Sequence, residues 1–188
     1  MGGSDDNDRG RFEALAMPLA RPLYGFALRL TRRSDDASDL VQETFLRAYR
    51  TFASFRPGTN AKAWMFKILH SVHVNEAKRR GRRPATTSID SAYDDGPMEI
   101  ADWSGTADIL TNPAIDWEGS EVEREVSALP EEFREAVLLV DLGDLTYEEA
   151  AEVAGCPVGT IRSRLARARR RLAERLRNVA RSRGLVKE

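Results

Sequence analysis

Residues 85–120 contain no lysine or arginine, are interrupted by glycine and proline, and show no sustained hydrophobic period. These features are typical of a linker, so we expect the segment to divide the chain into two lobes. The lobes, residues 1–84 and residues 121–188, are each just large enough for the small core of a short helical domain. Trp103 and Trp117 indicate that parts of the linker dock on another surface or on the linker itself, because a purely solvated tether has little use for indole rings.

The charge of the chain is distributed unevenly, although its 188 residues give a formal net charge of only −1. Residues 1–84 hold 16 basic and 9 acidic side chains, residues 85–120 hold 0 and 8, and residues 121–188 hold 13 and 13. Apolar residues make up 41% of the chain, which is too much for a fully disordered protein. The net charge therefore says nothing about a partner, because opposite local charges are hidden in it.

The sequence gives no indication of a membrane span, an internal disulfide or a metal site. No apolar run approaches the ~18 residues of a membrane span, and the polar, acidic first residues differ from a secretory signal, so we expect a cytoplasmic protein without membrane insertion. The lone Cys156 excludes an internal disulfide and a cysteine-rich zinc site, and we expect it to pack in a core instead of sensing redox state. His70 and His73 have no third ligand nearby in sequence, so we expect no metal and no cofactor.

Apolar residues of the first lobe recur at intervals of three and four, the period of amphipathic helices, and no stretch alternates with the period of a strand. We expect one helix along residues 12–30, interrupted in its early turns by Pro18 and Pro22. A second helix begins after Ser34, which can cap it, and a third runs from about residue 61 to 80. The apolar stripe expected on the second helix consists of four residues: Leu40, Val41, Phe45 and Tyr49.

The second lobe has the pattern of a helix followed by a helix-turn-helix. The first helix starts at Pro130 and ends near Gly143. A short helix then opens with a capping box formed by Thr146 and Glu149 and stops at Gly155. The long helix after this turn carries an apolar seam of six residues: Ile161, Leu165, Ala168, Leu172, Leu176 and Val179.

This long helix is strongly basic, because residues 162–187 contain 11 basic side chains and one acid. A helix-turn-helix places its second helix in the major groove, where arginine can fork onto the O6 and N7 atoms of guanine and serine can bond a base or a phosphate. Arginines further along can neutralise phosphates and fix the register. The capping box, the glycine turn and the basic face coincide, which favours DNA binding over an ordinary solvated basic helix.

Three motifs resemble those of extracytoplasmic-function sigma factors, the two-domain minimal type of the sigma-70 family. The sequence DLVQETFLRAYR at residues 39–50 resembles region 2.2, and FRPGTNAKAWMFKIL at residues 55–69 resembles the start of the promoter-melting segment. Residues 129–172 resemble region 4 throughout. The motifs follow the order of the family and cover most of both lobes.

The resemblance implies an all-α protein of two small domains that directs transcription initiation as an alternative sigma factor and catalyses nothing itself. Residues 1–84 would be region 2, which docks on the beta-prime clamp of core RNA polymerase and reads and opens minus-10 promoter DNA. Residues 121–188 would be region 4, which reads minus-35 DNA and meets the beta flap. The resemblance further implies a role in a stress response and an anti-sigma factor as a partner.

The resemblance also assigns residues to three surfaces. The predicted core-polymerase set is Asp39, Gln42, Glu43 and Arg47. The predicted minus-10 set is Lys62, Trp64, Lys67, Ser71, Asn75, Lys78 and Arg79, suited to stacking and hydrogen bonding of unpaired bases, although Trp64 can equally be a core residue. The predicted minus-35 set is Thr160, Arg162, Ser163, Arg164, Arg167 and Arg171. The family often has asparagine near the position of Ser71, so the base preferred there is open.

Two other classes of protein remain as alternatives. A free-standing helix-turn-helix repressor or activator would use the first lobe to sense a signal or to dimerise instead of binding polymerase. An enzyme with a DNA-binding tail would need clustered nucleophiles, bases or metal ligands, and the first lobe offers two histidines and no cysteine. For residues 85–120, the resemblance suggests a path through the basic channels of the polymerase, and a free solvated tether is the alternative.

Overall fold

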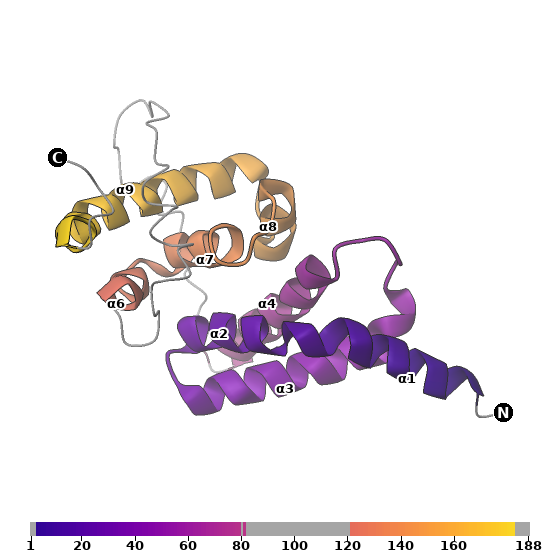
Figure 1. Cartoon of the computed structure of the whole chain (residues 1–188). Helices are drawn as coiled ribbons and strands as arrows, with labels where there is room; N and C mark the ends of the chain where they lie inside the picture. Colours follow the sequence, from indigo (N-terminus) through magenta and orange to yellow (C-terminus); the bar gives the residue numbers. More distant parts are fainter. Residues whose placement is uncertain (1–2, 80, 82–120, 183–188) are drawn as a thin grey trace. The chain divides into compact units, whose positions relative to one another are not determined.

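The computed structural model describes the backbone of residues 3–79, 81 and 121–182, and the side chains of residues 8–79, 81 and 121–177. All regular secondary structure in these ranges is helical, which confirms the all-α prediction (Figure 1). None of the helices described there is long and apolar enough to cross a membrane. The predicted linker lies outside the described residues, together with its two tryptophans. The chain forms two compact units.

The elements of the N-terminal unit are α1 (Gly3–Ala16), η1 (Met17–Leu19), α2 (Ala20–Thr31), α3 (Ser34–Thr51), η2 (Phe52–Ser54) and α4 (Ala61–Arg79). The expected interruption occurs at Pro18, which lies inside the short 3-10 turn η1. The interruption predicted at Pro22 does not occur, because Pro22 lies in the first turn of α2, where a backbone N–H has no partner within the helix. Ser34 is already the first residue of α3, and Arg33 precedes the helix without a side-chain cap, so the prediction that Ser34 caps this helix is wrong.

The core of the N-terminal unit lies where α2, α3 and α4 pack on one another, and Figure 1 shows α2 running alongside α3. Phe26 of α2 meets Phe66 of α4 edge-to-face, with ring centroids 4.9 Å apart. On α3 the fully buried positions are Ala37, Leu40, Thr44 and Ala48. Small residues there allow two neighbouring helices to approach closely.

The apolar stripe predicted for α3 is therefore only partly correct. Leu40 is buried, Val41 and Phe45 are half-buried, and 47% of Tyr49 is exposed. The buried line of α3 advances along its small residues at the helical period, and this turns the larger side chains toward the edge of the core.

The elements of the C-terminal unit are α6 (Glu121–Ser127), α7 (Glu131–Val140), α8 (Tyr147–Ala154) and α9 (Val158–Ser182). Helix α6 was not predicted, and α7 ends before Gly143. A Cβ atom at Gly143 would collide with the carbonyl oxygen of Leu139, so only glycine fits this turn. The capping box is confirmed, because the Thr146 backbone N–H donates to Glu149 Oε2 at 2.9 Å and the Glu149 N–H donates to Thr146 Oγ1 at 3.2 Å. Gly155 ends α8 with a φ of +64°, as the sequence predicted.

Candidate nucleic-acid and polymerase interfaces

Helix α9 packs one face against α6 and α7. The predicted apolar seam is confirmed at five positions, all of them buried: Ile161, Leu165, Ala168, Leu172 and Leu176. The sixth position, Val179, lies outside the described side chains. This seam fixes which arginines of α9 lie on its two flanks and which lie on its outer face.

Arg169 and Asp141 form a buried ion pair on one flank of α9. Arg169 Nε donates to Asp141 Oδ2 at 3.2 Å, and Arg169 Nη2 donates to the other oxygen of the same carboxylate. Only 2% of the Asp141 side chain and 20% of the Arg169 side chain are exposed. The two hydrogen bonds join the middle of α9 to the end of α7, because Asp141 directly follows that helix.

Burial has opposite effects on the two members of this pair. It raises the pKa of Asp141, and the hydrogen bond and positive charge of Arg169 offset part of that rise. Burial acts to lower the pKa of Arg169, but interactions with Asp141 and with Tyr147 outweigh it, so the pKa of Arg169 is raised. The guanidinium is therefore held in its charged form and is committed to groups of its own domain.

The opposite flank of α9 directs two further arginines toward α7. Arg164 Nη2 lies 3.6 Å from Glu132 Oε2, with 15% and 9% of the two side chains exposed. The guanidinium carbon of Arg171 lies 5.1 Å from the centroid of the Phe133 ring. Arg164 and Arg171 both belong to the predicted minus-35 set, and their contact with DNA stays a prediction.

The remaining members of the predicted minus-35 set lie on the outer face of α9, except Arg162, which lies seven residues before Arg169 and therefore on the flank of that residue. Arg162 is exposed, whereas Thr160, Ser163 and Arg167 are half-buried, and the Ser163 hydroxyl donates to the Thr160 carbonyl at 3.0 Å. Arg170 is also exposed and lies seven residues after Ser163, so it shares this face. The sequence interpretation missed Arg170, although its helical spacing from Ser163 could have identified it.

Arg162, at the start of α9, lies over an aromatic ring of α8. Its guanidinium carbon is 5.5 Å from the centroid of the Tyr147 ring, within the range of a cation–π contact. Tyr147 is the first residue of α8 and is half-buried. The preceding Thr146 belongs to the capping box, which fixes the start of this helix.

Helix α4 brings most of the predicted minus-10 set onto its surface. Five members are exposed: Lys67, Ser71, Asn75, Lys78 and Arg79. The first four recur at intervals of four and three, and they therefore share one face of the helix. This face combines two lysines with a hydroxyl and an amide, the groups needed to follow a phosphate backbone and to bond base edges.

The other two members, Lys62 and Trp64, are half-buried near the start of α4. Trp64 belongs to an aromatic cluster, with its ring centroid 5.0 Å from that of Phe55 and 6.4 Å from that of Phe52. The Asn60 side chain accepts a hydrogen bond from the Lys62 backbone N–H at 3.0 Å and so caps the helix. The indole is thus packed against its neighbours and still keeps an exposed part.

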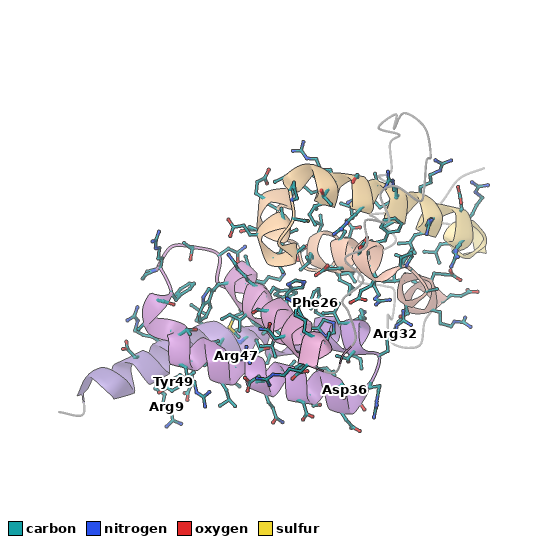
Figure 2. All side chains as sticks on the ribbon, turned by 180° about the vertical axis from the view of Figure 1, so that it is seen from behind. Arg9, Phe26, Arg32, Asp36, Arg47 and Tyr49 are labelled. Atoms are coloured by element: carbon teal, nitrogen blue, oxygen red, sulfur yellow. The ribbon has the colours of Figure 1, made fainter. Side chains whose placement is uncertain are left out.

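On α3 the predicted core-polymerase set combines two exposed residues, Asp39 and Gln42, with two half-buried ones, Glu43 and Arg47. Arg47 Nε donates to Glu43 Oε1 at 2.6 Å within the helix. The sequence interpretation missed Leu46, which is 52% exposed and lies seven residues after Asp39 on the same line of the helix. Figure 2 labels Arg47 and Tyr49, which lie two residues apart on this helix. An exposed leucine and an exposed tyrosine add apolar contact area to the predicted charged groups.

In the part of the chain that the structure describes, no three histidine, cysteine, aspartate or glutamate side chains are grouped closely enough to hold a metal ion. Cys156 lies in the turn before α9 and is half-buried. The prediction that it packs in the helix-turn-helix core is therefore correct only in part, because part of the residue faces solvent.

Two family models match the chain in the order that the sequence motifs suggested. Residues 15–83 match Sigma-70 region 2, and residues 120–172 match Sigma-70, region 4. The chain is 37% identical over 153 residues to the ECF RNA polymerase sigma factor EcfG of Rhodopseudomonas palustris, covering 80% of this chain and 77% of the relative. It is 29% identical over 177 residues to the RNA polymerase sigma-H factor of Pseudomonas aeruginosa, covering 93% and 90%.

A solved structure shows the same relationship, and a second one shows the same fold. The sigma factor RpoE of Bartonella quintana, crystallised in complex with the anti-sigma factor NepR, superposes with a TM-score of 0.66 at 31% identity, covering 89% of this chain and 97% of that one. CnrH, solved in complex with the cytosolic domain of CnrY, shares the fold with a TM-score of 0.59 at 22% identity, covering 93% and 92%.

Proposed function

Because the chain belongs to the extracytoplasmic-function sigma factors of the sigma-70 family, and is a non-enzymatic, alternative sigma factor for transcription initiation, we propose how its surfaces divide that work. Residues 1–84 bind core RNA polymerase and read and open minus-10 DNA. Residues 121–188 read minus-35 DNA and meet the beta flap, and residues 85–120 connect the two. Family membership decides against a free-standing repressor and against an enzyme with a DNA-binding tail.

The observation that carries the minus-35 proposal is the division of the α9 arginines between side chains directed to solvent and side chains that bind α7 or its end. Arg162 can fork onto a guanine from its exposed position at the start of the helix, and Ser163 can bond a neighbouring base or phosphate. Arg167 and Arg170 lie further along and suit phosphate contacts. Arg164, Arg169 and Arg171 bind α7 or its end and hold the outer face in a fixed orientation, and Arg164 and Arg171 stay members of the proposed minus-35 set.

For the minus-10 element, the exposed line on α4 supplies both charge and hydrogen bonding. Lys67 and Lys78 neutralise phosphates of the opened strand, while Ser71 and Asn75 between them bond the edge of an unpaired base. Lys62 and Arg79 extend the basic surface toward the two ends of the helix. Trp64 offers its exposed part as a stacking surface, supported from behind by Phe55 and Phe52.

For core polymerase, we place the beta-prime clamp on the exposed line of α3. Asp39 and Gln42 supply polar contacts, and Glu43 and Arg47 are already paired with each other, so they present a preorganised donor and acceptor. Leu46 supplies the apolar centre that charged residues alone would lack, since anchors of interfaces are typically large side chains in a desolvated position.

An anti-sigma factor is a further partner, as the resemblance in sequence implies. The Bartonella quintana relative was crystallised with an anti-sigma factor, and its similarity covers 89% of this chain. An anti-sigma factor is therefore the regulator that we propose for this protein. We propose that the protein acts in the cytoplasm, where core polymerase and promoter DNA meet, and that it takes part in a stress response.

Footprinting tests the division of work directly. Holoenzyme assembled from the full chain and core polymerase should protect two DNA segments on a responsive promoter, separated by the usual minus-35 to minus-10 spacing. A variant with Arg162→Ala and Arg167→Ala should lose protection of the upstream segment first, while Asn75→Ala should reduce opening of the downstream segment. Loss of the opposite segments would contradict the assignment of the two units.

A further inference from the structure

Arg162 is in an unusual situation for an exposed arginine at the start of a helix. Its guanidinium lies over the face of the Tyr147 ring, 5.5 Å from the centroid, although the two residues belong to different helices. An unrestrained arginine samples many rotamers and must give them up when it binds. Stacking on a fixed ring removes part of that freedom before DNA arrives.

The ring that holds Arg162 is itself held from several sides. The capping box of Thr146 and Glu149 fixes the backbone at the start of α8, immediately before Tyr147. The Tyr147 side chain also interacts with Arg169, whose guanidinium is fixed by two hydrogen bonds to Asp141. Arg162 and Arg169 are seven residues apart on α9 and thus lie on the same flank of the helix. Tyr147 interacts with both of them.

We propose that Tyr147 is a positioning residue for minus-35 recognition, which orients the guanidinium plane of Arg162 for bidentate contact with a base pair. The proposal rests on the reading role proposed for Arg162. Bidentate recognition of guanine requires both donors to lie in the plane of the base, so an oriented guanidinium favours the correct base over the others. Tyr147 need not touch the DNA itself, because it acts through Arg162.

The test measures base discrimination by holoenzyme made from the full chain and core RNA polymerase. A pool of duplex DNA randomised over the minus-35 segment is selected with the wild-type protein. The selected sequence is then prepared with each base pair replaced in turn, and relative affinities are measured for Arg162→Ala, Tyr147→Leu, Tyr147→Phe and the double variant Tyr147→Leu with Arg162→Ala.

We expect Arg162→Ala to relax discrimination at one position, and Tyr147→Leu to relax it at the same position by about two- to fivefold, the range of an exposed cation–π contact. Tyr147→Phe keeps the aromatic face and should retain discrimination close to that of wild type. In the Arg162→Ala background, Tyr147→Leu should cause no further loss, since the side chain through which it acts is gone.

The outcomes separate the two claims. An unchanged profile for Arg162→Ala would overturn the reading role of Arg162 and this inference with it. A changed profile for Arg162→Ala together with a wild-type profile for Tyr147→Leu would overturn the inference alone. Equal losses from Tyr147→Leu in both backgrounds would assign Tyr147 a merely structural role. Thermal melting accompanies each variant, and Tyr147→Met, which fills a similar volume without an aromatic face, replaces Tyr147→Leu if the latter fails to fold.

Discussion

Arg169 donates two hydrogen bonds to the carboxylate of Asp141, although the two residues lie 28 positions apart in the chain. The pair joins the reading helix of the C-terminal unit to the end of the helix that supports it. From the sequence alone, Arg169 would be assigned to phosphate contact. In the structure it binds Asp141 and stabilises the packing of α9 on α7 instead. The orientation of the outer face of α9 is therefore set by the apolar seam together with the arginines that contact α7 or its end: Arg164, Arg169 and Arg171.

Removal of Arg169 should make the stability of the C-terminal unit depend more strongly on pH. The folded-state pKa of Asp141 already lies above its ordinary value of 3.8, and Arg169 is the group that limits the rise. Without Arg169 the buried carboxyl binds its proton still more tightly in the folded state. Its contribution to stability is then fully present below the unfolded pKa and is lost as the pH rises through the folded pKa.

We therefore expect Arg169→Ala to cost about 3 kcal/mol of unfolding free energy at about pH 7 and much less at about pH 4. Urea unfolding of the full chain, with hydrogen exchange of α7 and α9 amides to resolve this unit, provides the measurement. Asp141→Asn is the matched control, because it leaves no carboxyl to titrate. Its deficit should not grow from about pH 4 to about pH 7, since the wild-type Asp141, whose pKa is raised, loses part of its own contribution over this range. A pH-independent deficit for Arg169→Ala would contradict the buried-pair account.

Two arginines adjacent in the chain should behave differently when each is replaced by alanine. Arg170 is exposed and pairs with the exposed Glu174 at 3.6 Å, whereas Arg171 covers the Phe133 ring. Arg170→Ala should leave the melting temperature unchanged and lower the slope of log affinity against log salt by about 1, the effect of losing one phosphate contact. Arg171→Ala should instead cost about 0.5 to 1 kcal/mol of folding stability. The reverse pattern in paired melting and salt-titration experiments would show that the faces of α9 are wrongly assigned.

Asn75 should matter for promoter opening only when its base is present. Asn75→Ala should impair transcription from duplex promoters that carry the preferred minus-10 base. The loss should be smaller on templates that already contain a bubble and in which this base is replaced, because the Asn75 amide reads the unpaired base. These templates differ in the bubble and in the base, so a bubble template that keeps the preferred base is the control, and the ratios of activity among the three templates are the measurement. An identical loss on all three templates would make Asn75 a structural residue of α4.

The apolar part of the α3 surface should be needed for assembly with core polymerase. Leu46→Glu should weaken core binding by about 2 kcal/mol, the size of an interface hot spot, while folding stability changes by no more than about 0.5 kcal/mol because the residue is half exposed. Met17→Glu makes the same chemical change at an exposed position of η1 and should leave core binding unaltered. Co-elution with core enzyme and thermal melting of both variants decide the matter, and retained co-elution of Leu46→Glu would refute the placement of the clamp.

Local sequence rules predicted much of this fold correctly. Pro18 interrupts the first helical stretch, Gly155 ends α8 with positive φ, and the Thr146–Glu149 capping box forms as expected. Each of these features depends on backbone geometry within a few residues, which side-chain chemistry determines directly. The seam of α9 was also predicted, because its apolar residues are regularly spaced.

The sequence could not decide where long polar side chains point. Arg164 and Arg170 look alike in the sequence, but one faces Glu132 from another helix and the other faces solvent. The choice depends on which residues α7 presents to α9, and that is set by tertiary packing. Tyr49 was assigned to the apolar stripe for a similar reason, since the buried line of α3 follows small residues that a hydrophobicity pattern undervalues.

Reconstituted transcription tests the central claim most directly. Core RNA polymerase is incubated with a library of genomic fragments, with and without the full chain, and transcript starts are mapped. The account predicts new start sites that depend on the chain, share upstream minus-35 and minus-10 sequences, and are lost with Leu46→Glu. Start sites that are the same with and without a folded, core-bound chain would contradict it.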